Sequence, residues 1–258
     1  MDLDLKGTIV LITGGSKGIG LACARAFAAE GAKLAICSRS QENVSRALAE
    51  FPGAFGIAAD LTDDKSATRM VDRVEQEFGA IDVLVNSAGA ARRTPPDELT
   101  PDVWRAAMDA KYFSYINVID PVVKRMAARA NGVIVNIIGA GGKLASPTHL
   151  AGGAANAALM LATAGLGAAY APRGVRIVGV NPGLTETERF TDGLTSSAKL
   201  AGISPEEARQ RSVAAIPMGR IARPEEIAAA VVFLASGKAS YITGVTIAMD
   251  GAAAPTVL

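Results

Sequence analysis

Thr13-Gly14-Gly15-Ser16-Lys17-Gly18-Ile19-Gly20 is the most informative structural motif in this chain of 258 residues. It directly follows the short β-branched run Thr8–Thr13 and opens the alanine-rich segment Gly18–Glu30, which has the composition of a helix. A glycine-rich turn between a strand and a helix is where parallel α/β sheets seat phosphate groups, because free N–H groups and the positive end of the helix dipole face the anion. The stretch therefore predicts a dinucleotide site.

Each glycine of this turn has an expected task. We expect Gly14 to allow the tight turn, Gly18 to let the backbone approach the pyrophosphate, and Gly20 to let the helix pack closely on the sheet. The residues of the turn that are expected to bind the cofactor are Gly14, Ser16, Lys17, Gly18, Ile19 and Gly20.

The rest of the chain alternates between strand-like and helix-like segments. Strands are expected at Thr8–Thr13, Lys33–Cys37, Ala54–Ala58, Ile81–Asn86, Val133–Ile138, Val175–Val180 and Thr246–Met249. Helices are expected at Gly18–Glu30, Gln41–Phe51, Ser66–Phe78, Pro101–Arg129 and Leu150–Tyr170. This alternation predicts a Rossmann-type α/β fold, a doubly wound parallel β-sheet with helices on both faces. We expect one domain over residues 1–258, with a substrate lid at residues 184–217.

Composition argues against several classes of protein. The net charge is +1, so we expect no nucleic-acid partner. No apolar run approaches the roughly 18 residues of a membrane span, and Met1–Lys6 lacks the pattern of a signal peptide, so we expect a cytoplasmic protein with no membrane contact. Cys23 and Cys37 lie in expected core elements without metal-ligand spacing, which predicts reduced, buried thiols and no metal site.

The spacing of the glycine turn and four further motifs resemble the short-chain dehydrogenase/reductase family over nearly the whole chain. Asn86-Ser87-Ala88-Gly89 is similar to the family's Asn-Asn-Ala-Gly motif, and Asp60-Leu61 to the pair that holds adenine. Asn181-Pro182-Gly183 with Thr187 is similar to the segment that contacts the nicotinamide carboxamide, and Gly244 with Asp250-Gly251 to the motif of the last strand. The resemblance implies further cofactor contacts from Asp60, Leu61, Asn86, Ala88, Gly89, Asn156, Pro182, Gly183, Thr185 and Thr187.

The end of the second strand favours NADP(H) over NAD(H). An enzyme that prefers NAD(H) needs a carboxylate there for the ribose hydroxyls, but this chain reads Cys37-Ser38-Arg39. Arg39 and Lys17 can both reach a 2′-phosphate, and Ser38 can donate a hydrogen bond to it. The alternative is that both cations are solvated surface residues.

The catalytic pattern departs from the family. There, a tyrosine transfers the proton, a lysine four residues later lowers the tyrosine's pKa, a serine binds the substrate oxygen and an asparagine completes the relay. This chain contains no Tyr-x-x-x-Lys sequence. Aligning Asn156-Ala157-Ala158-Leu159 with the family's Lys-Ala-Ala-Leu run puts Asn156 at the lysine, Gly152 at the tyrosine, Gly139 at the serine and Lys111 at the asparagine. Asn156 can still bond the ribose, but Gly152 supplies no proton.

Two residues are candidates for the missing chemistry. His149, the single histidine, lies three residues before Gly152 and therefore on the same helical face, where it can point into the space left by the phenol. Lys111 would face that pocket if the alignment holds, and there it would bind an anion or titrate. The alternatives are a surface or capping role for His149 and an interface salt bridge for Lys111.

Three functions remain open from the sequence. The first is an NADP(H)-dependent oxidoreductase for a small carbonyl or alcohol substrate with an unusual proton donor. The second is a catalytically silent subunit, beside an active paralogue in a hetero-oligomer, or a dinucleotide sensor. The third is non-redox lyase, isomerase or hydratase chemistry, suggested by a glycine-lined gap at Gly139–Gly142 and Gly152–Gly153. The family resemblance implies a homodimer or homotetramer, built through the fourth and fifth helices and the last strand. The sequence does not identify the substrate.

Overall fold

The structure, a computed structural model, describes residues 2–89 and 91–255 and contains one seven-stranded sheet. The strand order is β3-β2-β1-β4-β5-β6-β7, and every neighbouring pair is parallel. The strands are β1 Ile9–Thr13, β2 Lys33–Ser38, β3 Phe55–Ala58, β4 Val83–Asn86, β5 Gly132–Ile137, β6 Val175–Pro182 and β7 Thr246–Met249. This order confirms the doubly wound α/β fold. Because the order reverses between β1 and β4, their carboxyl ends open a crevice where such sheets bind ligands.

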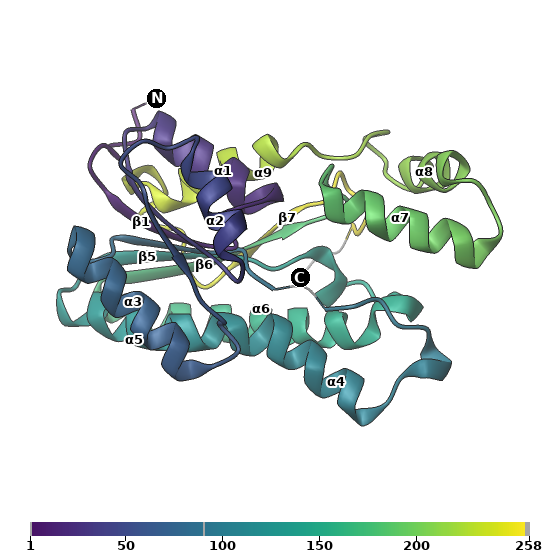
Figure 1. Cartoon of the computed structure of the whole chain (residues 1–258), viewed down its shortest axis with the longest axis horizontal. Helices are drawn as coiled ribbons and strands as arrows, with labels where there is room; N and C mark the ends of the chain where they lie inside the picture. The colour runs from purple at the N-terminus through teal and green to yellow at the C-terminus, as the bar shows by residue number, and fades with distance from the viewer. Residues whose placement is uncertain (1, 90, 256–258) are drawn as a thin grey trace.

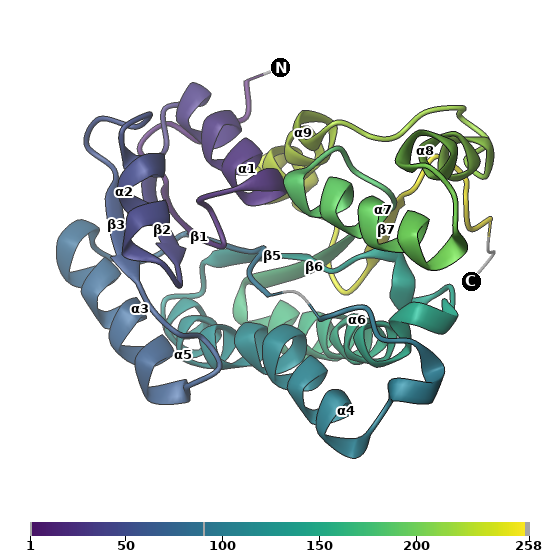
Figure 2. The ribbon, with the colours of Figure 1, turned by 45° about the vertical axis from the view of Figure 1, so that its right-hand side comes forward.

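Helices cover both faces of the sheet (Figures 1 and 2). One layer consists of α1 (Gly18–Ala29), α2 (Gln41–Leu48) and α9 (Pro224–Ala235). The other consists of α3 (Asp64–Phe78), α5 (Ser114–Ala128) and α6 (Leu150–Tyr170), with α4 (Pro101–Ala107) packed against α6. Helices α7 (Glu188–Ala201) and α8 (Pro205–Ala214) pack together at the side of the molecule, following the carboxyl end of β6.

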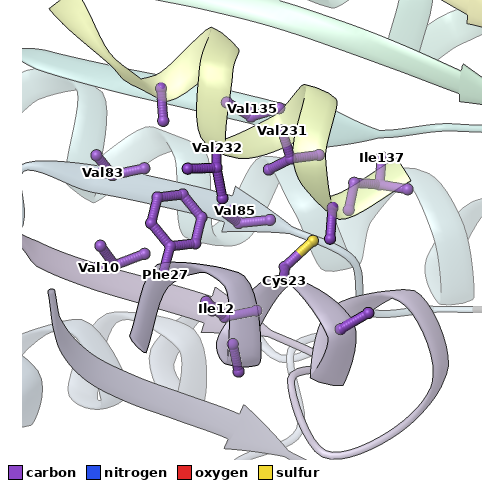
Figure 3. Packing of buried hydrophobic residues seen from close by; sticks show 14 of the residues in the cluster. Val10, Ile12, Cys23, Phe27, Val83, Val85, Val135, Ile137, Val231 and Val232 are labelled. Carbon is purple, nitrogen blue, oxygen red and sulfur yellow. The ribbon is translucent and has the colours of Figure 1, made fainter. Parts of the chain in front are cut away.

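Both faces of the central strands are buried. Val10 and Ile12 of β1 pack with α1 and α9, whereas Leu11 packs with the core on the opposite face. Figure 3 shows the first of these cores, where Phe27 of α1 and Val232 of α9 lie among valines of the strands. Burial on both sides explains why the strands read as continuous apolar runs rather than as alternating ones.

The expected elements are found with small shifts at their ends, and three features differ. The single helix expected at Pro101–Arg129 is divided by a π-helical turn, Met108–Phe113, between α4 and α5. The expected lid contains two helices, α7 and α8. Helix α9 was not expected. It begins with Pro224 and two acidic residues, Glu225 and Glu226, which are typical of a helix N-terminus but do not contribute to hydrophobic periodicity.

Contrary to the expectation that no apolar run approaches the length of a membrane span, one helical segment within the described ranges, Pro147–Arg173, is long and apolar enough to cross a membrane by length and composition. It contains α6, which packs along β6 and reaches the segment before β7. A Cβ atom on Gly167 would lie 2.5 Å from the Cα of Gly244, so backbone nearly touches backbone there. The helix is therefore part of the layer that covers one face of the sheet, and its apolar residues pack closely on that sheet.

Candidate dinucleotide and active site

The glycine turn leaves β1 and enters α1 as the sequence predicts. Gly14 and Gly18 have φ angles of 66° and 53°, in the region that favours glycine. A Cβ on Gly14 would lie 2.8 Å from the carbonyl oxygen of Ser87, and one on Gly20 would lie 2.3 Å from that of Gly14. Gly14 therefore permits both the turn and the approach of the segment after β4, while Gly20 lets α1 sit directly on the turn.

The start of α1 has the properties of an anion site. Lys17 is its N-cap but makes no side-chain capping bond, whereas Ser40 and Asp63 cap α2 and α3. The first turn of α1 also contains no acidic residue. The N–H groups at this end are therefore not used by a cap, and no carboxylate in the first turn opposes a negative ligand. These features fit the pyrophosphate of a dinucleotide.

The end of β2 lies beside the turn, because the N–H of Gly15 donates to the carbonyl of Cys37 at 3.3 Å. Ser38 ends β2 and Arg39 follows it as an exposed side chain. Asp60 is exposed after β3, and hydrogen bonds from the N–H and hydroxyl of Thr62, with a smaller contribution from the nearby Arg39 charge, lower its pKa.

Leu61 is buried, and its carbonyl accepts a hydrogen bond from the Asn117 side chain at 3.0 Å. The backbone of the Asp60-Leu61 pair is therefore held by α5, while the Asp60 carboxylate stays at the surface. This is the rim where the adenine half of a dinucleotide is expected, and direct contact with it stays a prediction for both residues.

A buried chain of polar side chains crosses the sheet below this crevice. The Thr13 hydroxyl donates to Asn86 Oδ1 at 3.3 Å, Asn86 Nδ2 donates to Asn136 Oδ1 at 3.0 Å, and Asn136 Nδ2 donates to Thr163 of α6 at 3.0 Å. The Thr13 hydroxyl also accepts from the N–H of Ala88 at 3.3 Å. Asn86 is fully buried, so its described role is to hold the strand ends in place. Sequence reasoning missed this chain because it depends on strand register.

The loop after β4 is shaped by Gly89, which has a φ of 88°. A Cβ there would lie 2.0 Å from the carbonyl oxygen of Ala110, at the π-helical turn. Glycine is thus required for the loop to pass this turn, and the loop and turn are placed together at the crevice.

The segment after β6 is arranged by short-range hydrogen bonds. The Thr185 hydroxyl donates to the Gly183 carbonyl at 3.2 Å, and Thr187 Oγ1 accepts from the N–H of Phe190 at 3.3 Å. Pro182 is the last residue of β6, and a Cβ on Gly183 would lie 2.9 Å from the Cα of Asp250. The expected nicotinamide segment and the last-strand motif are therefore in contact.

Helix α7, the first helix of the segment expected to form a lid, begins against the glycine turn. A Cβ on Gly18 would lie 3.3 Å from Thr187 Cγ2. One residue further, Glu188 forms an ion pair with Lys17, with 3.4 Å between Nζ and the carboxylate. Lys17, expected at the 2′-phosphate, is thus turned toward the start of α7 in this structure.

His149 lies directly over Gly152. A Cβ on Gly152 would lie 2.2 Å from His149 Cε1 and 2.7 Å from Nε2. On its other side, the imidazole lies against Gly141, whose Cβ would be 3.1 Å from Cδ2. The ring is therefore held between two glycines and occupies the space into which any larger side chain at position 152 would project.

Asn156 lies one turn after Gly152 on α6 and is 5% exposed. The position of a Cβ on Gly141 is 3.6 Å from Asn156 Nδ2 and 3.6 Å from His149 Nε2, so the two polar side chains flank one point of the loop. Within the described part of the chain, Asn156 Oδ1 is buried and has no hydrogen-bond partner. A buried amide oxygen of this kind is normally satisfied by a donor, and a ribose hydroxyl is one that fits.

Lys111 is held by Tyr115 and by the end of β5. It is 8% exposed, and its ammonium donates to the Tyr115 hydroxyl at 2.8 Å and to the Ile137 carbonyl at 3.0 Å. The Tyr115 hydroxyl donates to the same carbonyl at 2.5 Å. Lys111 therefore joins the π-helical turn to the end of β5, and a catalytic role for it stays a prediction. Tyr115 was not singled out from the sequence, although its spacing of four from Lys111 was visible.

The glycine-lined gap expected at residues 139–142 and 152–153 is largely filled. His149 fills the space at Gly152, and a Cβ on Gly142 would lie 2.6 Å from Met160 Cε. Beside it remains a pocket of about 250 Å³, whose lining includes Lys143, Ser146 and His149. The glycines thus serve close packing of the loop on α6 and leave a small pocket next to the imidazole.

A second loop holds the residue before His149. The N–H of Thr94 donates to the carbonyl of Thr148 at 2.9 Å, and the Arg93 guanidinium contacts the Thr148 hydroxyl at 3.4 Å. Thr94 is buried. Sequence reasoning missed this contact because its partners are far apart along the chain.

The two cysteines have the buried environment expected of them. Burial raises the pKa of Cys23 and of Cys37 to about 12, so both remain protonated thiols at neutral pH. Both are free. In the described ranges, no cluster of three or more potential metal ligands occurs.

The fold, the turn and the crevice define a dinucleotide-binding protein of the Rossmann type. Comparison with known families extends this: the family described as enoyl-(acyl carrier protein) reductase matches residues 14–252. The chain is 34% identical to the 3-oxoacyl-[acyl-carrier-protein] reductase FabG of Thermotoga maritima, over 96% of this chain and 98% of that protein. It is 35% identical to D-threitol dehydrogenase of Mycolicibacterium smegmatis, over 97% of this chain and 94% of that protein.

Among solved structures, the chain resembles a single-residue variant of actinorhodin polyketide ketoreductase with NADPH, with a TM-score of 0.93 and 28% identity, covering 97% of this chain and 98% of that one. It also resembles L-sorbose reductase of Gluconobacter frateurii, solved with NADPH and L-sorbose, with a TM-score of 0.92 and 27% identity over the whole of both chains. The chain therefore belongs to the short-chain dehydrogenase/reductase family and is a nicotinamide-dinucleotide-dependent oxidoreductase of that type.

Proposed function

We propose that this protein is an NADP(H)-dependent oxidoreductase for a carbonyl or alcohol substrate in which His149 gives or takes the proton. The observation that carries the proposal is the imidazole seated over Gly152, at the position that the family alignment assigns to the tyrosine. The bound nicotinamide supplies or accepts the hydride. When a carbonyl is reduced, its oxygen gains a proton, and the imidazole is the titratable side chain placed to donate it.

Asn156 takes the place of the lysine in this proposal. Its buried Oδ1 would accept a hydrogen bond from the nicotinamide ribose, and its amide lies beside the same loop as the imidazole. An amide orients the ribose without supplying charge, which suits a site whose proton donor is an imidazole rather than a phenol.

The preference for NADP(H) rests on charge. Arg39 and Ser38 follow β2 with no carboxylate at this place, and Lys17 is close by across the Gly15–Cys37 hydrogen bond. Two relatives by structure were solved with NADPH, which supports the same cofactor for this chain. A small-molecule substrate, cytoplasmic location and homo-oligomeric assembly complete the proposal.

The test removes the imidazole and, separately, displaces it. His149→Ala is expected to lower kcat for ketone reduction with NADPH by about 100-fold or more, because a general acid contributes roughly that amount. The variant should still bind NADPH, and added imidazole should restore part of the rate. Because the acid must be protonated, the wild-type reduction rate should fall as the pH rises, and His149→Ala should lose this dependence.

Gly152→Ala moves the ring without removing it, because the new Cβ would lie 2.2 Å from His149 Cε1. We expect kcat to fall about tenfold or more. Gly165→Ala is the matched control, since it lies on the same helix with no atom within 4 Å of the new Cβ. Turnover that His149→Ala leaves unchanged would show that His149 is not the donor. A wild-type protein that binds NADPH but reduces none of a panel of ketones would contradict the redox function.

A further inference from the structure

We propose that Glu188, the first residue of the lid helix, determines how strongly the protein distinguishes NADPH from NADH, by competing with the 2′-phosphate for Lys17. The inference rests on the proposed NADP(H) preference and adds a residue that opposes it. It is carried by the contact between Lys17 and Glu188, which joins the glycine turn to the lid.

Lys17 stands between two sites. The hydrogen bond from Gly15 to the carbonyl of Cys37 brings the turn to the end of β2, and Lys17 and Arg39 each lie two residues beyond this bond. On the other side, Thr187 lies against Gly18 and brings Glu188 to the lysine. One flexible ammonium thus lies within reach of the 2′-phosphate site and of the lid.

In this structure the ammonium is at the lid. Its Nζ is 3.4 Å from the Glu188 carboxylate, and the two side chains are 49% and 77% exposed. An exposed pair of this kind is weak and changes an equilibrium by up to about fivefold. A phosphate with nearly two negative charges attracts the ammonium more strongly, so Lys17 can leave Glu188, but the binding free energy is reduced by the contact that is lost.

Glu188 has a favourable position without Lys17. It occupies the first turn of α7, where a carboxylate interacts with the positive end of the helix dipole. Releasing the lysine therefore leaves the lid helix with a stabilised first residue. NADH has no 2′-phosphate that could compete for Lys17, so the Lys17–Glu188 contact is kept when NADH binds. The competition therefore affects only NADPH.

The experiment measures Kd for NADPH and NADH by calorimetry at low salt, without substrate or turnover. For Glu188→Gln we expect NADPH to bind about two- to fivefold more tightly and NADH to bind unchanged. Lys17→Met should weaken NADPH binding about tenfold or more. In the Lys17→Met background, Glu188→Gln should have no effect on NADPH, because the double-mutant cycle removes the shared partner.

Glu186→Gln is the matched control, because it makes the same charge change two residues earlier on a carboxylate that pairs with Arg209 at 2.6 Å. It should leave both affinities unchanged. Equal tightening of NADPH and NADH in Glu188→Gln, an effect that persists without Lys17, or no effect at all would overturn the inference. A wild-type protein that binds NADH as tightly as NADPH would overturn the cofactor preference itself, and the inference with it.

Discussion

At the scale of single residues, the positions of His149 and Asn156 depend on the residues around them. His149 can lie where it does because Gly152 has no Cβ, so a glycine at this position makes room for the imidazole. Asn156 lies on α6 and His149 on the turn before it, and both side chains lie close to Gly141. Neither placement can be read from either residue alone.

The buried pair Lys111–Tyr115 gives a prediction at this scale. Tyr115→Phe removes a hydroxyl that accepts from a buried ammonium, so we expect a loss of about 2 kcal/mol in the free energy of unfolding. Urea unfolding measures it. In the same assay, Lys111→Met should lower the free energy of unfolding by less than the removal of one partner from a buried ion pair does. The reason is that it removes the buried charge itself, so no charge is left without a partner.

The double variant supplies the control. Because the two residues share one contact, the loss in Lys111→Met/Tyr115→Phe should be smaller than the sum of the single losses. Strict additivity, or a Tyr115→Phe protein as stable as the wild type, would mean that this contact contributes nothing to stability.

At the scale of elements, α6 is the helix on which the site and the fold both depend. Its first turns carry Gly152 and Asn156, and its later turns pack on β6 and on the segment before β7. Small residues dominate its sequence, because the loop at residues 139–142 and the backbone near Gly244 both approach it closely.

Two glycines of α6 are expected to respond in opposite ways to the same change. Gly165→Ala places a methyl group at an exposed helix position with no neighbouring atom of the described residues within 4 Å, and it should stabilise the folded chain by about 0.5–1 kcal/mol. Gly167→Ala places it 2.5 Å from the Gly244 backbone and should destabilise by about 1–3 kcal/mol. Thermal unfolding of the two variants checks the signs. Equal shifts in the same direction would mean that helix propensity alone governs both sites.

At the scale of the whole molecule, charge and thiol burial define a pH range of stability. Hydrogen bonds from Arg220 and from the N–H of Arg223 lower the pKa of Glu226 from 4.5 to about 2, and the pKa of Glu50 and of Asp60 is also lowered. A lowered folded-state pKa stabilises above the unfolded value and loses this effect as the pH falls toward the folded value. For Cys23 and Cys37, whose pKa is raised, stability present below 9.0 is lost as the pH rises toward 12.

We therefore expect the free energy of unfolding to fall as the pH drops from 4.5 toward 2 and as it rises above 9.0. Urea unfolding across this range measures both declines. Glu226→Gln, which removes one of the titrating groups, should show a shallower decline on the acid side. An identical acid profile for this variant would show that the Arg220–Glu226 pair does not contribute.

Two groups of exposed apolar side chains are candidate surfaces for assembly of the whole molecule. One set lies on the side of α4 and α6, and the other near α9 and β7. They are Trp104, Phe113 and Leu161 on the first face and Phe233, Tyr241 and Val245 on the second. Because monomers seldom expose such groups together, we predict that both faces are buried between copies of the chain.

Light scattering tests this prediction. Leu161→Glu should break the first interface and Val245→Glu the second. If the wild type is a tetramer, each variant should have half its mass. If the wild type is a dimer, only one of the two variants should become a monomer. If the wild type is a monomer at micromolar concentration, the prediction is wrong.

Local sequence patterns were enough to predict the strands, most helices and the glycine turn and to show that no Tyr-x-x-x-Lys pair is present, because these depend on neighbouring residues and on local periodicity. The sequence also indicated His149 through its spacing from Gly152. The three-dimensional structure was needed to show that the imidazole lies over Gly152, that Lys111 bonds to Tyr115 and Ile137, and that Lys17 pairs with Glu188. These contacts join segments that are distant in sequence or depend on side-chain direction, and sheet register and helix packing set both.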